Sequence, residues 1–156
     1  MRGKPPTVWL AALLAGWALS AGPVGDLTFM LNDLRARGMA CAGSSSTEPV
    51  GLLSYSPRLE QAALRHARDM AERNFIAHTF AGLGPRERVR QAGYDFLRLS
   101  EIIYKGGSSA DPLRPLEWWL NSPVHCQAIM SPHYSEVGVA FWPQGNAWVV
   151  VLAQPR

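Results

Sequence analysis

The chain has 156 residues, of which 47% are hydrophobic and 17% are charged. This length suits one domain and the apolar fraction is enough to form a core, so a multidomain enzyme and a disordered chain are both excluded. The formal net charge is +3, but Arg2 and Lys4 precede an apolar run at the N-terminus. Without these two, 13 basic residues face 12 acidic ones, a balance that gives no reason to expect nucleic-acid binding or a polybasic membrane patch.

Residues 1–21 have the pattern of a signal peptide. A positively charged start is followed by the apolar run 8–19 and then by small residues, and cleavage is expected after Ser20 or Ala21. The run is shorter than the ~20 apolar residues that span a bilayer. The alternative is an uncleaved membrane anchor. We expect a mature domain of residues 22–156, without a transmembrane segment, that is secreted or periplasmic.

Export changes the interpretation of the two cysteines, Cys41 and Cys126. They are the only pair in the chain, and an oxidising compartment favours a disulfide between them. The bridge would close a loop of 85 residues, which stabilises the fold by about 4–5 kcal/mol at most. Two free thiols are the alternative. Neither cysteine belongs to a CxxC or Cys–His cluster, so a structural zinc site is not expected.

The hydrophobic pattern changes along the chain from helical to strand spacing. Helical patterns are found at 26–37, 56–74, 85–91, 113–120 and 123–130. Two β-rich runs follow, at 136–142 and 147–152, and the Pro-Gln-Gly-Asn sequence between them predicts a hairpin. Helices followed by antiparallel strands indicate an α+β fold.

Four polar residues are candidates for a functional site. His78 follows the second predicted helix, and Glu87 lies beside Arg88 on what is ordinarily a solvated helix face. Glu101 stands inside an apolar run, where an unpaired carboxylate is costly to bury, so it is either paired or faces a polar cleft. His125 lies in the first turn of the last predicted helix. Taken singly, none of the four identifies a site.

Five motifs in order give the chain its resemblance to a known family. They are LLSYSPRLEQAALRHARDMAERNFIAHT, ERVRQAGY, SEII, EWWLNSPVHCQAIM and YSEVGVAFW. Over residues 26–154 the chain resembles the CAP superfamily of cysteine-rich secretory, antigen 5 and pathogenesis-related class 1 proteins (the SCP domain), and its short bacterial branch in particular. The resemblance implies an α-β-α sandwich in which helices flank a small antiparallel sheet.

The same resemblance implies where a site would lie. The family's cleft holds two histidines and two acids, which correspond to His78, Glu87, Glu101 and His125. The two imidazoles would hold Zn²⁺ or another divalent cation weakly, while the carboxylates orient the rings. No residue is assigned a catalytic role.

The sequence departs from the family pattern beside the candidate residues. Ser100 and Ile102 replace a Gly and an Asn next to the central Glu, Val124 replaces the Gly before the second His, and Ala128 replaces a frequent Asn. These changes put metal affinity in doubt more than the fold. Outside the set, His66 is interpreted as a packing or surface residue and His133 as exposed, while Trp118 and Trp119 are expected in the core.

By this resemblance the chain is expected to be a non-enzymatic extracellular or periplasmic binding module. Its ligand would be a lipid, a sterol or another small molecule, or its partner an extracellular protein, and the chain itself would be a monomer. One alternative is a metal-assisted hydrolase that uses the His and Glu residues, with His78 and His125 on the ion. A second alternative is a structural protein of the cell envelope.

Overall fold

The computed structural model describes residues 22–156, so the predicted signal peptide lies outside the described residues. The elements in chain order are α1 (Gly22–Arg37), β1 (Ser54–Tyr55), α2 (Pro57–Glu72), α3 (Pro85–Gln91), β2 (Phe96–Lys105), α4 (Leu113–Leu120), α5 (Pro123–Ile129), β3 (Glu136–Trp142) and β4 (Ala147–Pro155). Within this part of the chain, no helix combines the length and the hydrophobicity needed to cross a membrane.

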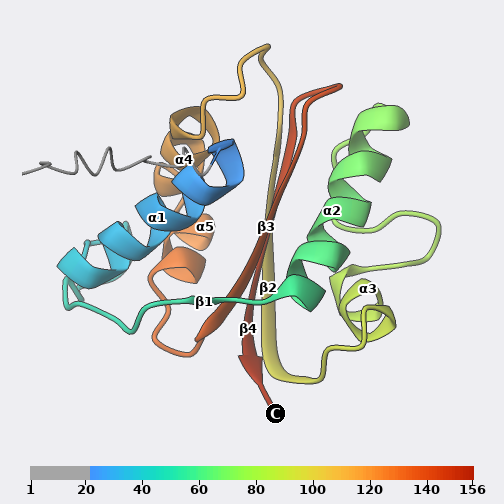
Figure 1. Cartoon of the computed structure of the whole chain (residues 1–156). Helices are drawn as coiled ribbons and strands as arrows, with labels where there is room; N and C mark the ends of the chain where they lie inside the picture. Colours follow the sequence, from blue (N-terminus) through green and yellow to red (C-terminus); the bar gives the residue numbers. More distant parts are fainter. Residues whose placement is uncertain (1–21) are drawn as a thin grey trace, which may run out of the picture.

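One four-stranded sheet lies between two helical layers (Figure 1). Its strand order is β1-β3-β4-β2, and β4 pairs antiparallel with both of its neighbours. Helices α1, α4 and α5 cover one face, and α2 and α3 cover the other (Figure 1). This arrangement confirms the predicted α+β class and α-β-α layering. The short β1 adds a two-residue parallel pair with β3, which the sequence did not predict.

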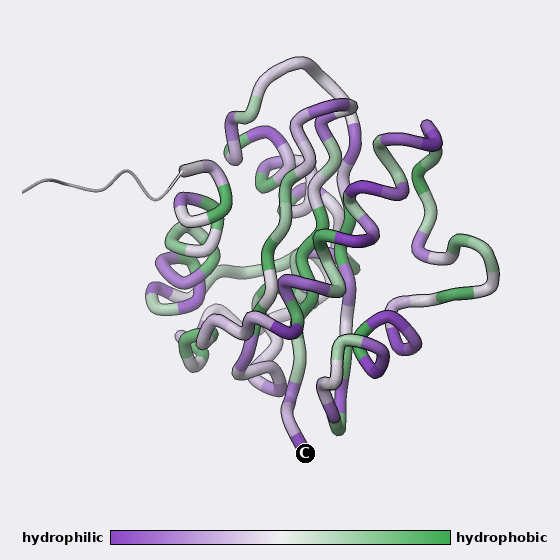
Figure 2. Tube along the Cα trace, turned by 45° about the vertical axis from the view of Figure 1, so that its right-hand side comes forward, coloured by the Kyte–Doolittle hydropathy of each residue, from purple (hydrophilic) through white to green (hydrophobic). Residues whose placement is uncertain are grey.

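Strand β4 contributes side chains to two hydrophobic cores, one on each face of the sheet. Val149 and Val151 pack in the core beneath α2 and α3, whereas Val150 and Leu152 pack in the core beneath the other three helices. Successive side chains of a strand point to opposite faces of the sheet, so a strand covered on both faces is apolar at every position. Figure 2 shows hydrophobic stretches gathered along the central strands, with hydrophilic colour on the outer turns of the helices.

Close approach of α2 to the sheet depends on one glycine. A Cβ atom at Gly138 of β3 would overlap the backbone of Leu59 and Glu60. The absence of a side chain there lets the first turn of α2 rest directly on the strand. This contact fixes how the start of α2 lies on the sheet.

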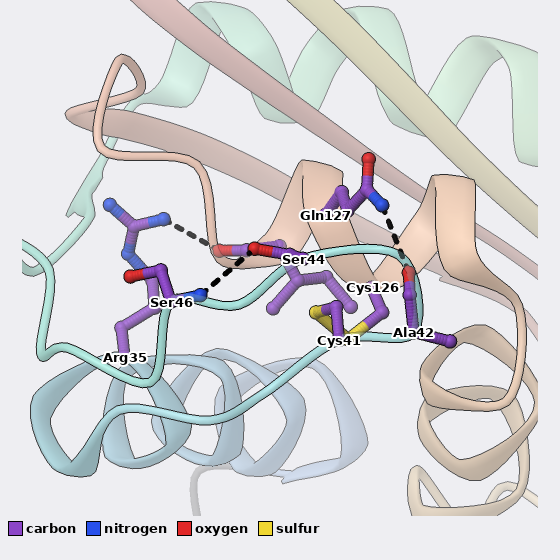
Figure 3. The surroundings of a disulfide bond; sticks show 8 residues. Arg35, Cys41, Ala42, Ser44, Ser46, Cys126 and Gln127 are labelled. Atoms are coloured by element: carbon purple, nitrogen blue, oxygen red, sulfur yellow. Dashed lines mark hydrogen bonds between the residues drawn. A yellow bond between two sulfur atoms is a disulfide. The ribbon is translucent and has the colours of Figure 1, made fainter.

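A disulfide joins Cys41 to Cys126, as expected from the sequence, with a Cα–Cα distance of 5.7 Å that lies within the usual range. It ties the segment after α1 to α5 (Figure 3). The side chain of Gln127 reinforces the link by donating a hydrogen bond of 3.0 Å to the carbonyl oxygen of Ala42.

A fully buried arginine connects the same two helices. The side chain of Arg35, at the end of α1, donates to four backbone carbonyls and contacts no carboxylate in the described chain. The acceptors are the carbonyl oxygens of Gly51 (2.7 Å), Ile129 (2.6 Å), Ser131 (2.9 Å) and Tyr134 (2.9 Å). Burial lowers the pKa of Arg35, but a guanidinium stays charged in proteins. The positive charge is therefore held by carbonyl dipoles alone.

Candidate functional site

Glu101 is the centre of a buried polar network at the sheet edge. It lies on β2 opposite Val151, and only 1% of its side chain is exposed. Its Oε2 accepts a hydrogen bond of 2.7 Å from Arg88 Nη2, and its Oε1 accepts one of 2.9 Å from His78 Nδ1. The carboxylate is therefore paired, which is one of the two outcomes that its apolar sequence context allowed.

Arg88 was interpreted as part of a solvated helix face, and that interpretation is wrong. Its side chain is 2% exposed, because Arg88 shares the inner face of α3 with Val89. Besides pairing with Glu101, it donates from Nη1 to the carbonyl oxygens of His78 and Leu83, both at 2.9 Å. Arg88 thus fixes the loop that carries His78 as well as the charge of Glu101.

His66 is a further member of the network that the sequence reasoning left out. The ring is fully buried on α2, and its Nε2 lies 2.7 Å from the carbonyl oxygen of Ala77 and 3.9 Å from Glu101 Oε1. Because a carbonyl only accepts, Nε2 carries the hydrogen. Burial lowers the pKa of His66, although the charge of Glu101 acts in the opposite direction. The neutral imidazole of His66 therefore holds the backbone of Ala77, the residue before His78, by a hydrogen bond.

His78 presents one free ring nitrogen. The carboxylate of Glu101 accepts the hydrogen of Nδ1, so the neutral ring keeps a lone pair on Nε2. The side chain is 48% exposed, and its backbone is held by Arg88. A carboxylate that orients a histidine in this way is a common arrangement behind a metal-binding nitrogen.

His125 approaches the same region from the opposite helical layer. It lies on α5, and its ring centroid is 5.1 Å from that of Trp118. Burial lowers the pKa of His125, and the electrostatic effect of His78 lowers it further. Only half of the tryptophan prediction is right: Trp119 is buried, whereas Trp118 is 49% exposed.

Glu87 has a different role in the structure. Its carboxylate accepts a hydrogen bond of 3.1 Å from the backbone N–H of Gly84 and so caps its own helix. Within residues 22–156 it makes no hydrogen bond or ion pair to His78, Glu101 or His125. The same described residues contain no group of three or more His, Cys, Asp or Glu side chains placed to hold a metal ion.

A separate apolar groove runs along α1. It has a volume of about 890 Å³ and lies between this helix, the segment through β1 and the start of α2. Phe29 is 71% exposed there, beside the exposed Leu52 and Tyr55. Its other lining residues are Val24, Gly25, Thr28, Asn32, Asp33, Ala36 and Glu60. This groove was not predicted from the sequence, although Phe29 interrupts the polar face of the first helix.

The model of a protein family described as the cysteine-rich secretory protein family, CAP, matches residues 28–154. Among curated proteins, YkwD of Bacillus subtilis is 26% identical over 97 residues, which make up 62% of this chain and 37% of that protein. The chain spans between a quarter and about half of the length of the curated relatives that it matches.

Two solved bacterial structures share the fold. One is an extracellular protein of Bacillus anthracis containing an SCP domain, with a TM-score of 0.71 and 20% identity over 85% of this chain and 40% of that chain. The other is an outer surface protein of Borrelia burgdorferi, with a TM-score of 0.72 and 22% identity over 86% of this chain and 93% of that one.

Proposed function

Because the chain belongs to the cysteine-rich secretory protein family, we propose that it is an exported, non-enzymatic binding module whose α1 groove takes a lipid-like ligand. The groove is the observation that carries the proposal. Its volume lies within the 300–1,000 Å³ typical of ligand pockets. The exposed side chains of Phe29, Leu52 and Tyr55 lie together in it, and a contiguous exposed apolar patch is typical of a ligand or partner site. The extracellular and outer-surface bacterial proteins of the same fold support export.

The contacts of the two acids support a non-enzymatic reading over the hydrolase alternative. A general base needs a carboxylate that is free to accept a proton from bound water. Glu101 is bound by Arg88 and His78, and Glu87 caps its own helix. Both carboxylates therefore have structural partners already.

We expect Phe29→Gln to weaken the binding of a neutral probe, hexadecanol carrying a nitrobenzoxadiazole fluorophore, by about 10- to 100-fold. Burial of a phenylalanine side chain contributes about 1.5–3 kcal/mol, which corresponds to that range. Fluorescence titration measures the change, and Phe29 is exposed, so the fold should tolerate glutamine. Leu97→Gln is the matched control, because Leu97 is an exposed apolar residue on β2 outside the groove. Equal losses in both variants, or no binding by the wild type, would contradict the proposal.

His78 and His125 give reason to propose a second activity, weak binding of a divalent cation such as Zn²⁺. The free Nε2 of His78 and the neutral ring of His125 are suitable nitrogen ligands. Two histidines are fewer than the three or four protein ligands of dedicated zinc sites, so the affinity should be low. When bound, the ion would supply Lewis-acid polarisation, while Glu101 would hold the His78 ring in place.

Calorimetric titration with zinc chloride should therefore show binding far weaker than nanomolar at pH 7.5, lost in His78→Ala and retained in His133→Ala. His133 is the control because it is exposed and outside the network. Binding should weaken at about pH 5.5, since a protonated imidazole cannot bind a metal and an unperturbed histidine titrates near ~6.5. Nanomolar affinity, or affinity unchanged by pH or by His78→Ala, would show that the assignment is wrong.

A further inference from the structure

The charged residues of the α1 groove restrict the kind of amphiphile that it can hold. Asp33 on α1 and Glu60 in the first turn of α2 line the groove, and no lysine, arginine or histidine is found among its described lining residues. The two carboxylates belong to different elements, joined by the segment through β1 that runs from α1 to α2 (Figure 1). The groove therefore combines apolar walls with a formal charge of one sign at its border.

The local contacts compensate one of the two carboxylates and leave the other without a cation. Asp33 pairs with Arg37 one helical turn further along α1, where both side chains are exposed. Glu60 accepts a hydrogen bond from the hydroxyl of Tyr55, a groove residue, and this bond raises the pKa of Tyr55. The guanidinium of Arg37 is thus already paired with Asp33, whereas Glu60 makes no ion pair within the described residues and leaves a negative charge at the groove without a cation.

We propose that the α1 groove selects amphiphiles with a positively charged, ammonium-bearing head and rejects those with a carboxylate or sulfate head. The inference rests on the proposed lipid-binding function and adds the class of head group to it. The apolar chain would lie against Phe29 and Leu52, which are the most exposed apolar side chains of the groove. The head would lie at the border formed by Asp33 and Glu60, where charge complementarity selects between ligands of equal hydrophobicity.

The test is a competition between three ligands that share one sixteen-carbon chain: hexadecyltrimethylammonium, hexadecanol and palmitate. Each is added below its micelle-forming concentration to full-length protein carrying the fluorescent hexadecanol probe, and displacement is followed by fluorescence. The ammonium should compete at least about fivefold more effectively than palmitate at low salt, with hexadecanol between them. Added salt should reduce the difference, because the groove is open to solvent.

The matched variants separate charge selection from chain binding. Asp33→Asn combined with Glu60→Gln should remove most of the preference while leaving hexadecanol unchanged, whereas Glu117→Gln, an exposed carboxylate on α4, should leave the preference intact. Palmitate competing as well as the ammonium, or a preference unaltered in the double variant, would overturn this inference while leaving the proposed function standing. Failure of the probe to bind at all would instead overturn the proposed function.

Discussion

Replacing Arg35 with methionine is expected to lower the free energy of unfolding by about 3–5 kcal/mol. The side chain is fully buried and donates to four carbonyl oxygens, which join the end of α1 to α5 and to the turn after it. Methionine fills similar space but donates no hydrogen bond, and each hydrogen bond to a charged donor contributes about 1.5–3 kcal/mol before the cost of burying that charge. Chemical denaturation measures the difference.

Two further variants identify the origin of the loss. Arg37→Met changes the same residue type two positions along α1, where the guanidinium is exposed and forms only a helical ion pair with Asp33, so its effect should stay within about 0.5 kcal/mol. Arg35→Lys keeps the charge but lacks the planar fork that reaches several carbonyls at once, and it should recover only part of the loss. Equal stability of Arg35→Met and Arg37→Met would exclude a structural role for Arg35.

The variant Glu101→Gln is expected to destabilise the fold by about 3–5 kcal/mol as well. Glutamine has nearly the same shape, but it leaves the guanidinium of Arg88 buried without a counter-charge, and loss of one partner from a buried ion pair costs about this much. The same substitution replaces the charged acceptor of His78 Nδ1.

Glu72→Gln is the matched control, because Glu72 forms an ion pair of 2.8 Å with Arg68 on the exposed face of α2. Surface pairs contribute about 0–1 kcal/mol, so this variant should be nearly neutral. Adding Arg88→Met to Glu101→Gln should restore part of the stability, since the unpaired charge is then removed. A loss in Glu101→Gln no larger than that in Glu72→Gln would show that the network is not an essential part of the fold.

Local patterns were sufficient to predict most of the elements but not the strand that carries Glu101. The bounds predicted for α3, α4 and β3 agree with the structure, and α1 begins four residues earlier than expected, at Gly22. Strand β2 was missed because Ile102 and Ile103 are both buried, one on each face of the sheet. A strand covered on both faces has no alternation of apolar and polar residues to recognise.

Local patterns also indicated only part of the candidate site. Glu101 stood out because a carboxylate in an apolar run is either paired or faces a polar cleft, and the structure shows that it is paired. Its partner Arg88 was overlooked because an arginine beside Glu87 on a short helix suggests a solvated face, whereas the structure places Arg88 on the buried side of α3 with Val89. The position of His66 beside Glu101 depends on how α2 crosses the sheet, which no local pattern specifies.

The sharing of β4 between two cores has a consequence for how the domain unfolds. Because consecutive residues of this strand serve opposite helical layers, loss of either layer exposes apolar side chains of a strand on which the other layer still packs. The domain should therefore lose both layers in one cooperative transition. In native-state hydrogen exchange, the amides of β4 should exchange only through global unfolding, which makes this strand the slowest-exchanging part of the protein.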